Sequence, residues 1–228
     1  MSDEPVLTSF RLADSFLPVG SYTASYGLEQ FIQANDITDV DELEALLETY
    51  LRSLLGPGEL VVLRVAHTAA REGDLDGVCK ADRRLAATTL AAEFRESATR
   101  TGNRLLSLET DLRDDDLLDA YADRVSEDTP GMHPAVMGAV AGRRGVPSHE
   151  ACLCHCHSFV TGLLGVAQRL LSLGHTDAQR ILTTLQPTMT AAVADSADRS
   201  LDELTPFAPL IDVAAADHER AERRLFMS

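Results

Sequence analysis

The chain has 228 residues, of which 45% are hydrophobic, so it is long enough to bury a sizeable core. Its 36 acidic residues outnumber 20 basic ones and give a formal net charge of −16, which argues against nucleic-acid binding because a phosphate backbone repels such an excess. There is no run of about 18 apolar residues that would predict a membrane span, and the acidic N-terminus lacks the cationic start of a secretory signal. We therefore expect a cytoplasmic protein.

Helical periodicity dominates the sequence. Leucines and a tyrosine between Leu43 and Leu54 fall three and four residues apart, with acids on the opposite face, which predicts an amphipathic helix. Asp39 and Glu42 form a plausible capping box at its start, and the tripeptide Gly56-Pro57-Gly58 is expected to end it. A second helix should then run over about residues 59–71.

Further helices are expected along the rest of the chain. Their predicted ranges are about 75–90, 92–111, 114–126, 134–144, 148–173 and 210–224. Gly174 should end the long helix that begins at Ser148, and Thr176 with Gln179 is typical of the next capping box. Pro187 should break or kink the helix in which it lies.

Together these segments predict one all-α domain over residues 1–228, with about ten helices packed around a buried central helix. The segment 148–173 is apolar almost all round, so it is the best candidate for that central helix. Gly162 and Gly165 would let a neighbouring element approach it closely. The ends, about residues 1–5 and 221–228, are expected to be flexible.

A cluster of cysteines and histidines lies near the start of this segment. Only residues three or four apart share a helical face, which groups His149, Cys152, His155 and Cys156. Thiolates and imidazoles bind nickel and zinc, so a metal-binding protein is one interpretation. Four ligands on one straight helix cannot readily surround a tetrahedral ion, however, and buried cysteines also serve as small apolar core residues.

Signals for an enzyme are weak. The phosphate-binding motif G-x-x-x-x-G-K-[ST], the dinucleotide motif G-x-G-x-x-G and the zinc motif H-E-x-x-H are absent. A nucleophilic cysteine in the Cys/His cluster is a third possibility, but no group that would orient it can be named. We therefore expect a protein without catalytic residues and without a cofactor.

Two segments carry unusual combinations of side chains. Between Leu17 and Glu29 the tyrosines Tyr22 and Tyr26 are four residues apart, so one turn of helix could present an aromatic pair beside a carboxylate. Farther along, Arg95-Glu96-Ser97 precedes Arg100 in a chain that is poor in cations. This arginine-bearing segment either forms ion pairs along its own helix or contacts another macromolecule.

These segments and three others resemble the UreF family in the order in which that family shows them. The five blocks are Leu17–Glu29, Arg95–Ser97 with Gly102 and Leu105-Leu106, His133–Gly138, Leu173–Arg180, and Arg224-Leu225-Phe226-Met227-Ser228. The chain departs from the family pattern at Ser172, at His175 and at Met227, where the tail usually carries an arginine. Each block is short, but the ordered set spans nearly the whole chain.

The resemblance implies an all-helical, homodimeric, non-catalytic accessory protein of nickel urease maturation. Members of the family bind the accessory protein UreD, called UreH in some systems, and the GTPase UreG, and the assembly docks on urease apoprotein so that nickel reaches the active site. The residues it implicates in partner contacts are Tyr22, Tyr26, Glu29, Arg95, Glu96, Arg100, His133, Gly138, Gln179, Arg224, Leu225 and Phe226. Leu225 and Phe226 are expected to be hydrophobic anchors that order when a partner buries them.

The charge balance generates a first prediction. With Lys80 as the only lysine and a net charge of −16, the composition is typical of haloarchaeal proteins. Salt at about 1 M shortens the Debye length to roughly 3 Å and screens the self-repulsion of such a surface. We expect helicity, measured by circular dichroism, to fall when the salt is lowered from molar to millimolar. An unchanged spectrum would contradict a halophilic protein.

Overall fold

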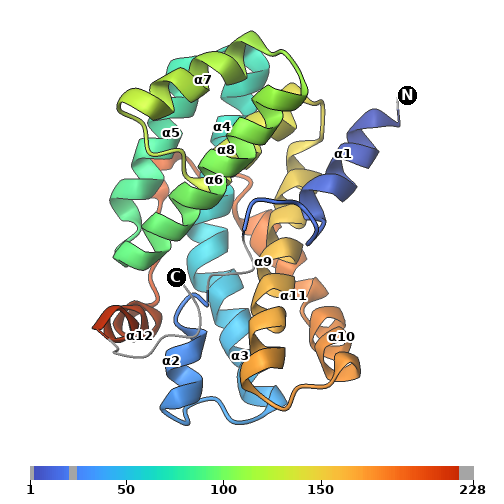
Figure 1. Ribbon diagram of the computed structural model, residues 1–228, viewed down its shortest axis with the longest axis vertical. Coiled ribbons are helices and arrows are strands. Elements are labelled where there is room, and N and C mark those ends of the chain that lie inside the picture. Colours follow the sequence, from blue (N-terminus) through green and yellow to red (C-terminus); the bar gives the residue numbers. More distant parts are fainter. Residues whose placement is uncertain (1–2, 21–24, 221–228) are drawn as a thin grey trace.

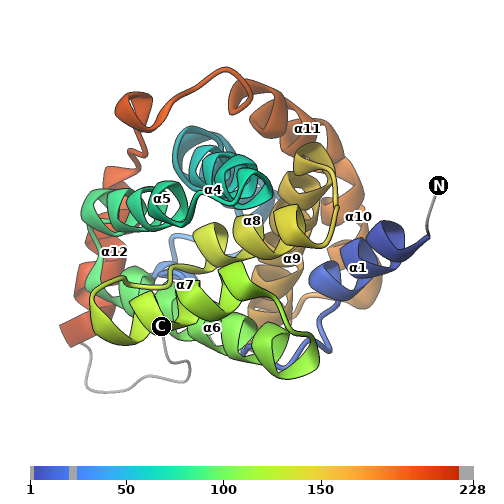
Figure 2. The ribbon, with the colours of Figure 1, turned by 90° about the horizontal axis from the view of Figure 1, so that it is seen from above.

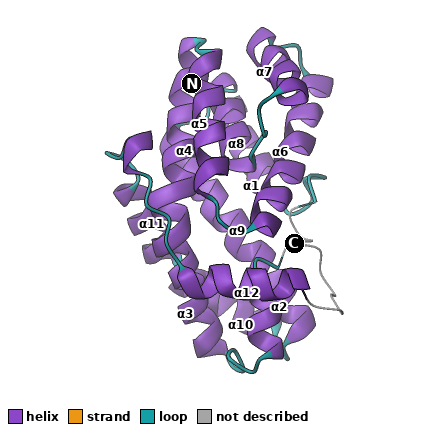
Figure 3. Cartoon of the chain, turned by 90° about the vertical axis from the view of Figure 1, so that its left-hand side faces the viewer, coloured by secondary structure: helices purple, strands orange, loops and turns teal. Residues whose placement is uncertain are grey.

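The computed structural model describes residues 3–20 and 25–220, and the fold is built from helices that follow one another along the chain (Figure 1). No strand occurs within these ranges (Figure 3). The α-helices in chain order are α1 (Glu4–Ala13), α2 (Leu28–Gln33), α3 (Val40–Tyr50), α4 (Leu60–Glu72), α5 (Leu75–Thr88), α6 (Ala92–Leu112), α7 (Asp116–Glu127), α8 (His133–Arg143), α9 (Ser148–Leu170), α10 (His175–Thr184), α11 (Gln186–Asp195) and α12 (Pro209–Arg220). A π-helical segment, η2 (Leu51–Glu59), joins α3 to α4, and a 3-10 turn, η3 (Leu201–Glu203), precedes α12.

One hydrophobic core connects these helices, so the expectation of a single all-α domain is confirmed. Seen along the long axis of the molecule, α4 and α8 lie in the middle, and α5, α6, α9 and α11 surround them (Figure 2). The most completely buried helix is α8, in which every residue from Pro134 to Gly142 is buried. Helix α9, predicted to be central, instead lies beside this pair and exposes His149 and His157.

Two glycines allow α4 and α8 to cross at close range. A methyl group added at Gly138 would overlap the Leu63 carbonyl oxygen, and one at Gly142 would overlap the His67 carbonyl oxygen. The backbones therefore touch where side chains would normally hold helices apart. Gly138, predicted to belong to a partner-binding site, thus supports the centre of the fold.

The tripeptide Gly56-Pro57-Gly58 does not end a helix, contrary to the sequence prediction. The chain continues from α3 through η2 into α4, with Pro57 inside the helical segment. An α-helix would have bonded the N–H of residue 57 to the Ser53 carbonyl, and proline has no such N–H. The backbone N–H of Phe207 donates to that carbonyl instead, at 3.0 Å, and the Thr205 N–H donates to the Pro57 carbonyl at 3.1 Å. A distant segment of the chain therefore completes the interrupted helix.

Helix boundaries differ from the sequence prediction at several other points. Asp39 caps α3 as expected, but Glu42 accepts hydrogen bonds from Thr38 and does not complete a capping box. Helix α9 ends at Leu170 rather than at Gly174, and Gly174 is the N-cap residue of α10. Pro187 separates two helices as expected, because it occupies the first turn of α11.

The close crossing of α4 and α8 generates a second prediction. Gly138→Ala should lower the free energy of unfolding by about 1–3 kcal/mol, because the new methyl group has no space beside the Leu63 carbonyl. The control is Gly162→Ala on α9, where no described atom beyond the chain neighbours and the nearby α9 backbone lies within 4 Å of the added carbon. Helix propensity alone should therefore raise its stability by up to about 1 kcal/mol. Urea denaturation measures both. Equal stabilities for the two variants would contradict the tight crossing.

Candidate partner-binding surface

Tyr26 lies where two pockets meet and has an uncommon backbone conformation. Its φ of 48° falls in the left-handed region, as does the φ of 79° at Gly27, so the chain turns sharply before α2 begins at Leu28. Tyr26 is therefore not on a helical turn with Glu29, contrary to the sequence prediction. Its ring packs against Phe94 and Phe159, with centroids 5.1 and 5.0 Å away, and its carbonyl accepts a hydrogen bond from the Tyr50 hydroxyl.

Glu29 is buried and joins three helices. The ring of His218 on α12 lies between two carboxylates: Nδ1 is 2.9 Å from Glu93 on α6, and Nε2 is 3.2 Å from Glu29 on α2. None of these side chains is more than 7% exposed. Glu29, expected on a partner-contacting or dimer-supporting face, therefore lies inside the chain and helps to hold α12 in place.

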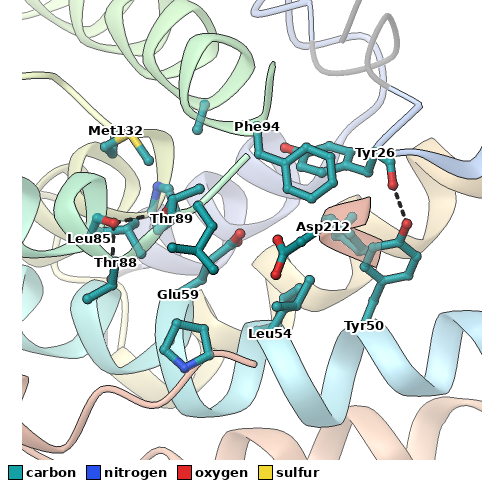
Figure 4. Close-up of a pocket in the computed structure, with 17 residues that line it drawn as sticks. Tyr26, Tyr50, Leu54, Glu59, Leu85, Thr88, Thr89, Phe94, Met132 and Asp212 are labelled. Carbon is teal, nitrogen blue, oxygen red and sulfur yellow. Dashed lines mark hydrogen bonds between the residues drawn. The ribbon is translucent and has the colours of Figure 1, made fainter. Parts of the chain in front are cut away.

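The smaller of the two pockets has a volume of about 40 Å³ and lies between η2, the turn after α5, and α12. Figure 4 shows Glu59 and Asp212 pointing into it, with Phe94 and Tyr50 nearby. Burial raises the pKa of the Asp212 carboxyl group. Burial, followed by the nearby Glu59 carboxylate, raises the pKa of Tyr26, so its phenol keeps its proton. The pocket thus holds carboxyl and hydroxyl groups in a largely apolar wall.

The larger pocket has a volume of about 320 Å³ and lies on the other side of Tyr26. The α1–α2 loop, α6, α8 and α9 form its walls, and both His133 and His155 line it. The rings of these histidines are 5.5 Å apart, and burial, with the nearby His155, lowers the pKa of His133 to about 3. His133 is therefore uncharged at neutral pH. His155 Nε2 lies 2.6 Å from a Glu59 carboxylate oxygen, which connects the larger pocket to the smaller one.

The arginine-bearing segment on α6 does not act as a unit. Arg95 donates to the carbonyl oxygens of Thr89 and Leu90, at 2.6 and 2.7 Å, and so fixes the turn between α5 and α6. Glu96 is exposed, whereas Arg100 is half-buried and its charge acts on the Tyr26 phenol. Of the two arginines, Arg100 is thus the one that acts on Tyr26, beside Ser97, whose side chain is hydrogen-bonded to that phenol.

The remaining predicted partner-binding residues either lie far from Tyr26 in the sequence or fall outside the residues that the structure describes. Gln179 is exposed on α10, at the lower end of the molecule in Figure 1. Tyr22 and the C-terminal residues Arg224, Leu225 and Phe226 lie outside the described residues, so their assignment stays a prediction.

The proposed metal ligands do not converge. His149 is exposed, whereas Cys152 and Cys156 are buried, and His155 is bonded to Glu59. Burial raises the pKa of the Cys152 thiol to about 11 and raises that of Cys156 as well, which disfavours the thiolates that bind metal. Within residues 3–20 and 25–220, no group of three or more His, Cys, Asp or Glu side chains is arranged to hold an ion. The high thiol pKa values equally disfavour a nucleophilic cysteine.

The surface carries apolar side chains that sequence patterns did not single out. One set lies on α1 and the loop after it, comprising Val6, Leu7, Phe10 and Phe16. Another comes from α12 and the turn before it, comprising Phe207, Leu210 and Val213. A helical-wheel comparison of α1 would have shown two partly apolar faces, but only the fold decides which of them is buried.

The chain is similar to known proteins over nearly its full length. A family model described as UreF matches residues 37–186 of the chain. The chain belongs to the UreF family. Urease accessory protein UreF of Trichodesmium erythraeum (strain IMS101) is 34% identical over 221 residues, which cover 96% of this chain and 95% of that protein. The protein of the same name from Bacillus sp. (strain TB-90) is 32% identical, with 98% and 99% covered, and urease accessory protein UreF 1 of Brucella melitensis biotype 1 is 30% identical, with 98% and 92% covered.

The UreF family model spans α3 to the start of α11, whereas the relatives align over nearly the full chain. The full-length similarity therefore extends to α1, to the Tyr26 turn and to α12, which carry the exposed apolar residues and the His218 contacts. Each of these relatives is named a urease accessory protein. Of the described helices, none is both long and apolar enough to cross a bilayer.

The environment of His133 generates a third prediction. Between about pH 6.5 and pH 3 the unfolded histidine binds a proton, whereas the folded ring stays neutral. The free energy of unfolding should therefore fall as the pH is lowered through this range. The slope from this residue cannot exceed about 1.4 kcal/mol per pH unit, because one histidine exchanges at most one proton.

The test compares wild type with His133→Gln by urea denaturation at a series of pH values. The variant should lose stability less steeply as the pH falls, while His67, whose pKa burial also lowers, still contributes in both proteins. The control is His157→Gln, which replaces an exposed histidine of α9 and should leave the slope unchanged. Parallel curves for wild type and His133→Gln would refute the assignment.

Proposed function

We propose that this protein is a non-catalytic adaptor in urease maturation. It joins UreD or UreH and the GTPase UreG on urease apoprotein, and so supports the insertion of nickel into the active site. We further propose that it works in the cytoplasm as a homodimer, with neither nucleic acid nor membrane as a partner. The family membership supports the maturation role, and the surface of α1 is the observation on which the docking role depends.

Helix α1 places its larger apolar side chains toward solvent. The side that packs on α9 carries Thr8, Ser9 and Leu12, all buried. The opposite side carries Val6, Leu7 and Phe10, which are 46%, 64% and 66% exposed. Phe16 in the following loop is 89% exposed. Exposed apolar side chains grouped on one helix are typical of a protein–protein interface.

Specific contacts hold this helix in position. Glu4 forms an ion pair with Arg113, and Arg11 forms one with the buried Glu109 of α6. Cys154 on α9 donates to the Ser9 carbonyl at 3.4 Å. Helix α1 lies along the edge of the molecule against α9 (Figure 2). Because its position is set before a partner arrives, little ordering entropy is lost on binding.

The buried titratable groups support an adaptor rather than an enzyme. His218 is held by Glu29 and Glu93, and His155 is held by Glu59, so these groups connect helices to one another. The C-terminal Leu225 and Phe226 remain proposed anchors for UreD or UreH.

The exposed face of α1 generates a fourth prediction. The double variant Leu7→Glu, Phe10→Glu should weaken association with purified UreD or UreH by at least about tenfold, because each change places a charge in a contact that excludes water. Size-exclusion chromatography in high salt with UreD or UreH and UreG measures the complex. The control is Ala194→Glu, which adds one glutamate at an exposed position of α11.

Circular dichroism should be the same for all three proteins, since both substituted residues of α1 face solvent. If the double variant joins the complex as well as wild type does, α1 is not the docking surface. If wild type itself joins neither accessory protein, the adaptor function is refuted.

A further inference from the structure

One face of α9 lines the larger pocket and carries two glycines. His155, Ser158, Gly162 and Gly165 follow one another at intervals of three and four residues, so they share this face, and all four line the pocket. Each mid-helix glycine costs up to about 1 kcal/mol relative to alanine. Contrary to the sequence prediction, no described atom beyond the chain neighbours and the nearby α9 backbone lies within 4 Å of a carbon added at Gly162 or Gly165, so neither glycine serves close packing among the described residues. Their effect is to leave space.

Two polar atoms on the same face are buried without a hydrogen-bond partner in the described structure. They are Nδ1 of His155, a residue only 4% exposed, and Oγ of Ser158. An unpaired polar atom of this kind costs about 1–3 kcal/mol, which a bound group could recover by pairing with it. The pocket therefore has open volume and, on its α9 side, a polar base formed by these two atoms.

The contact with Glu59 determines what His155 offers to a bound group. Nε2 carries the hydrogen that is donated to the Glu59 carboxylate, at 2.6 Å. In the neutral ring Nδ1 is then a hydrogen-bond acceptor, and in the protonated ring it is a donor. A hydroxyl group can satisfy either form, because it both donates and accepts.

The pocket wall is mostly apolar, so the group that carries this hydroxyl should be apolar as well. Leu12, Leu17, Val19, Phe159 and Leu163 line the pocket beside the polar base. The volume of about 320 Å³ is at the lower end of the range of roughly 300–1,000 Å³ for small-ligand pockets. A phenol has both an apolar ring and one hydroxyl group at its end.

We propose that this pocket receives the tyrosine side chain of a partner protein, with its phenolic hydroxyl bonded to His155 Nδ1 and Ser158 Oγ. The occupant is assigned to a partner because residues of the α1–α2 loop line the pocket, and Phe16 in the same loop is 89% exposed and available to the same partner. Tyrosine is favoured at interfaces because its ring is apolar and its hydroxyl finds a partner when buried. This inference rests on the adaptor function proposed above.

The first experiment uses p-cresol as the probe and toluene as its matched control without the hydroxyl. In NMR titrations, p-cresol should shift signals of pocket residues saturably, and toluene should bind roughly thirtyfold more weakly, because it lacks both hydrogen bonds. Gly162→Leu should abolish the shifts by filling the pocket, and it should still fold because leucine favours helix. Ala194→Leu, at an exposed position of α11, should leave them unchanged. Absent binding, or equal binding to Gly162→Leu, overturns the pocket.

The second experiment distinguishes a partner side chain from a free small molecule. Purified UreD or UreH and UreG are mixed with wild type, Gly162→Leu and Ala194→Leu, and complexes are separated by size-exclusion chromatography. The inference requires that only Gly162→Leu loses a partner. If p-cresol binds but Gly162→Leu still forms the complex, the pocket takes a free molecule and the partner assignment is wrong. If wild type forms no complex at all, the adaptor function itself has failed.

Discussion

The structure depends on how the chain continues through Pro57. Proline removes the N–H that would have bonded the Ser53 carbonyl, and the backbone of Phe207 supplies the missing donor. This exchange attaches the segment before α12 to the central rod of α3, η2 and α4. Gly58 lies against Pro206, so a side chain at that position would hinder the same approach. The end of η2 also carries Glu59, which reaches His155 on α9. One interrupted helix thus connects the two pockets and the C-terminal helix.

Internal charges in this acidic protein serve to join elements that are distant in sequence. Glu29 and Glu93 hold His218, and Arg144 pairs with the buried Glu109, which also binds Arg11. These charged groups are paired with each other inside the fold, whereas the apolar side chains of α1 and its loop, like those near α12, are exposed to solvent in the described structure. This division, with polar groups connecting helices inside and apolar groups exposed outside, supports the adaptor role proposed above.

Much of the fold could be predicted because helical signals are local. The stripe from Leu43 to Leu54, the Asp39 cap and the break at Pro187 each depend on neighbours within one or two turns. Predictions that required knowledge of distant contacts failed. Gly56-Pro57-Gly58 was predicted to end a helix, because the hydrogen bond that lets the helix continue comes from the distant Phe207. Glu29 was predicted to lie on the surface, because its partner His218 is far away in sequence. Gly162 and Gly165 looked like packing positions, yet they line a pocket.

Local spacing and composition were therefore sufficient to predict an all-α domain, and the ordered blocks were sufficient to predict the family. Both predictions depend only on short stretches of neighbouring residues. Long-range packing alone decided which helix is most deeply buried, which glycines touch a backbone and which face of α1 meets solvent. These outcomes depend on side chains that meet only after the chain has folded, as Phe207 meets Ser53 and His155 meets Glu59. The spacing of residues within one helix cannot predict such long-range contacts.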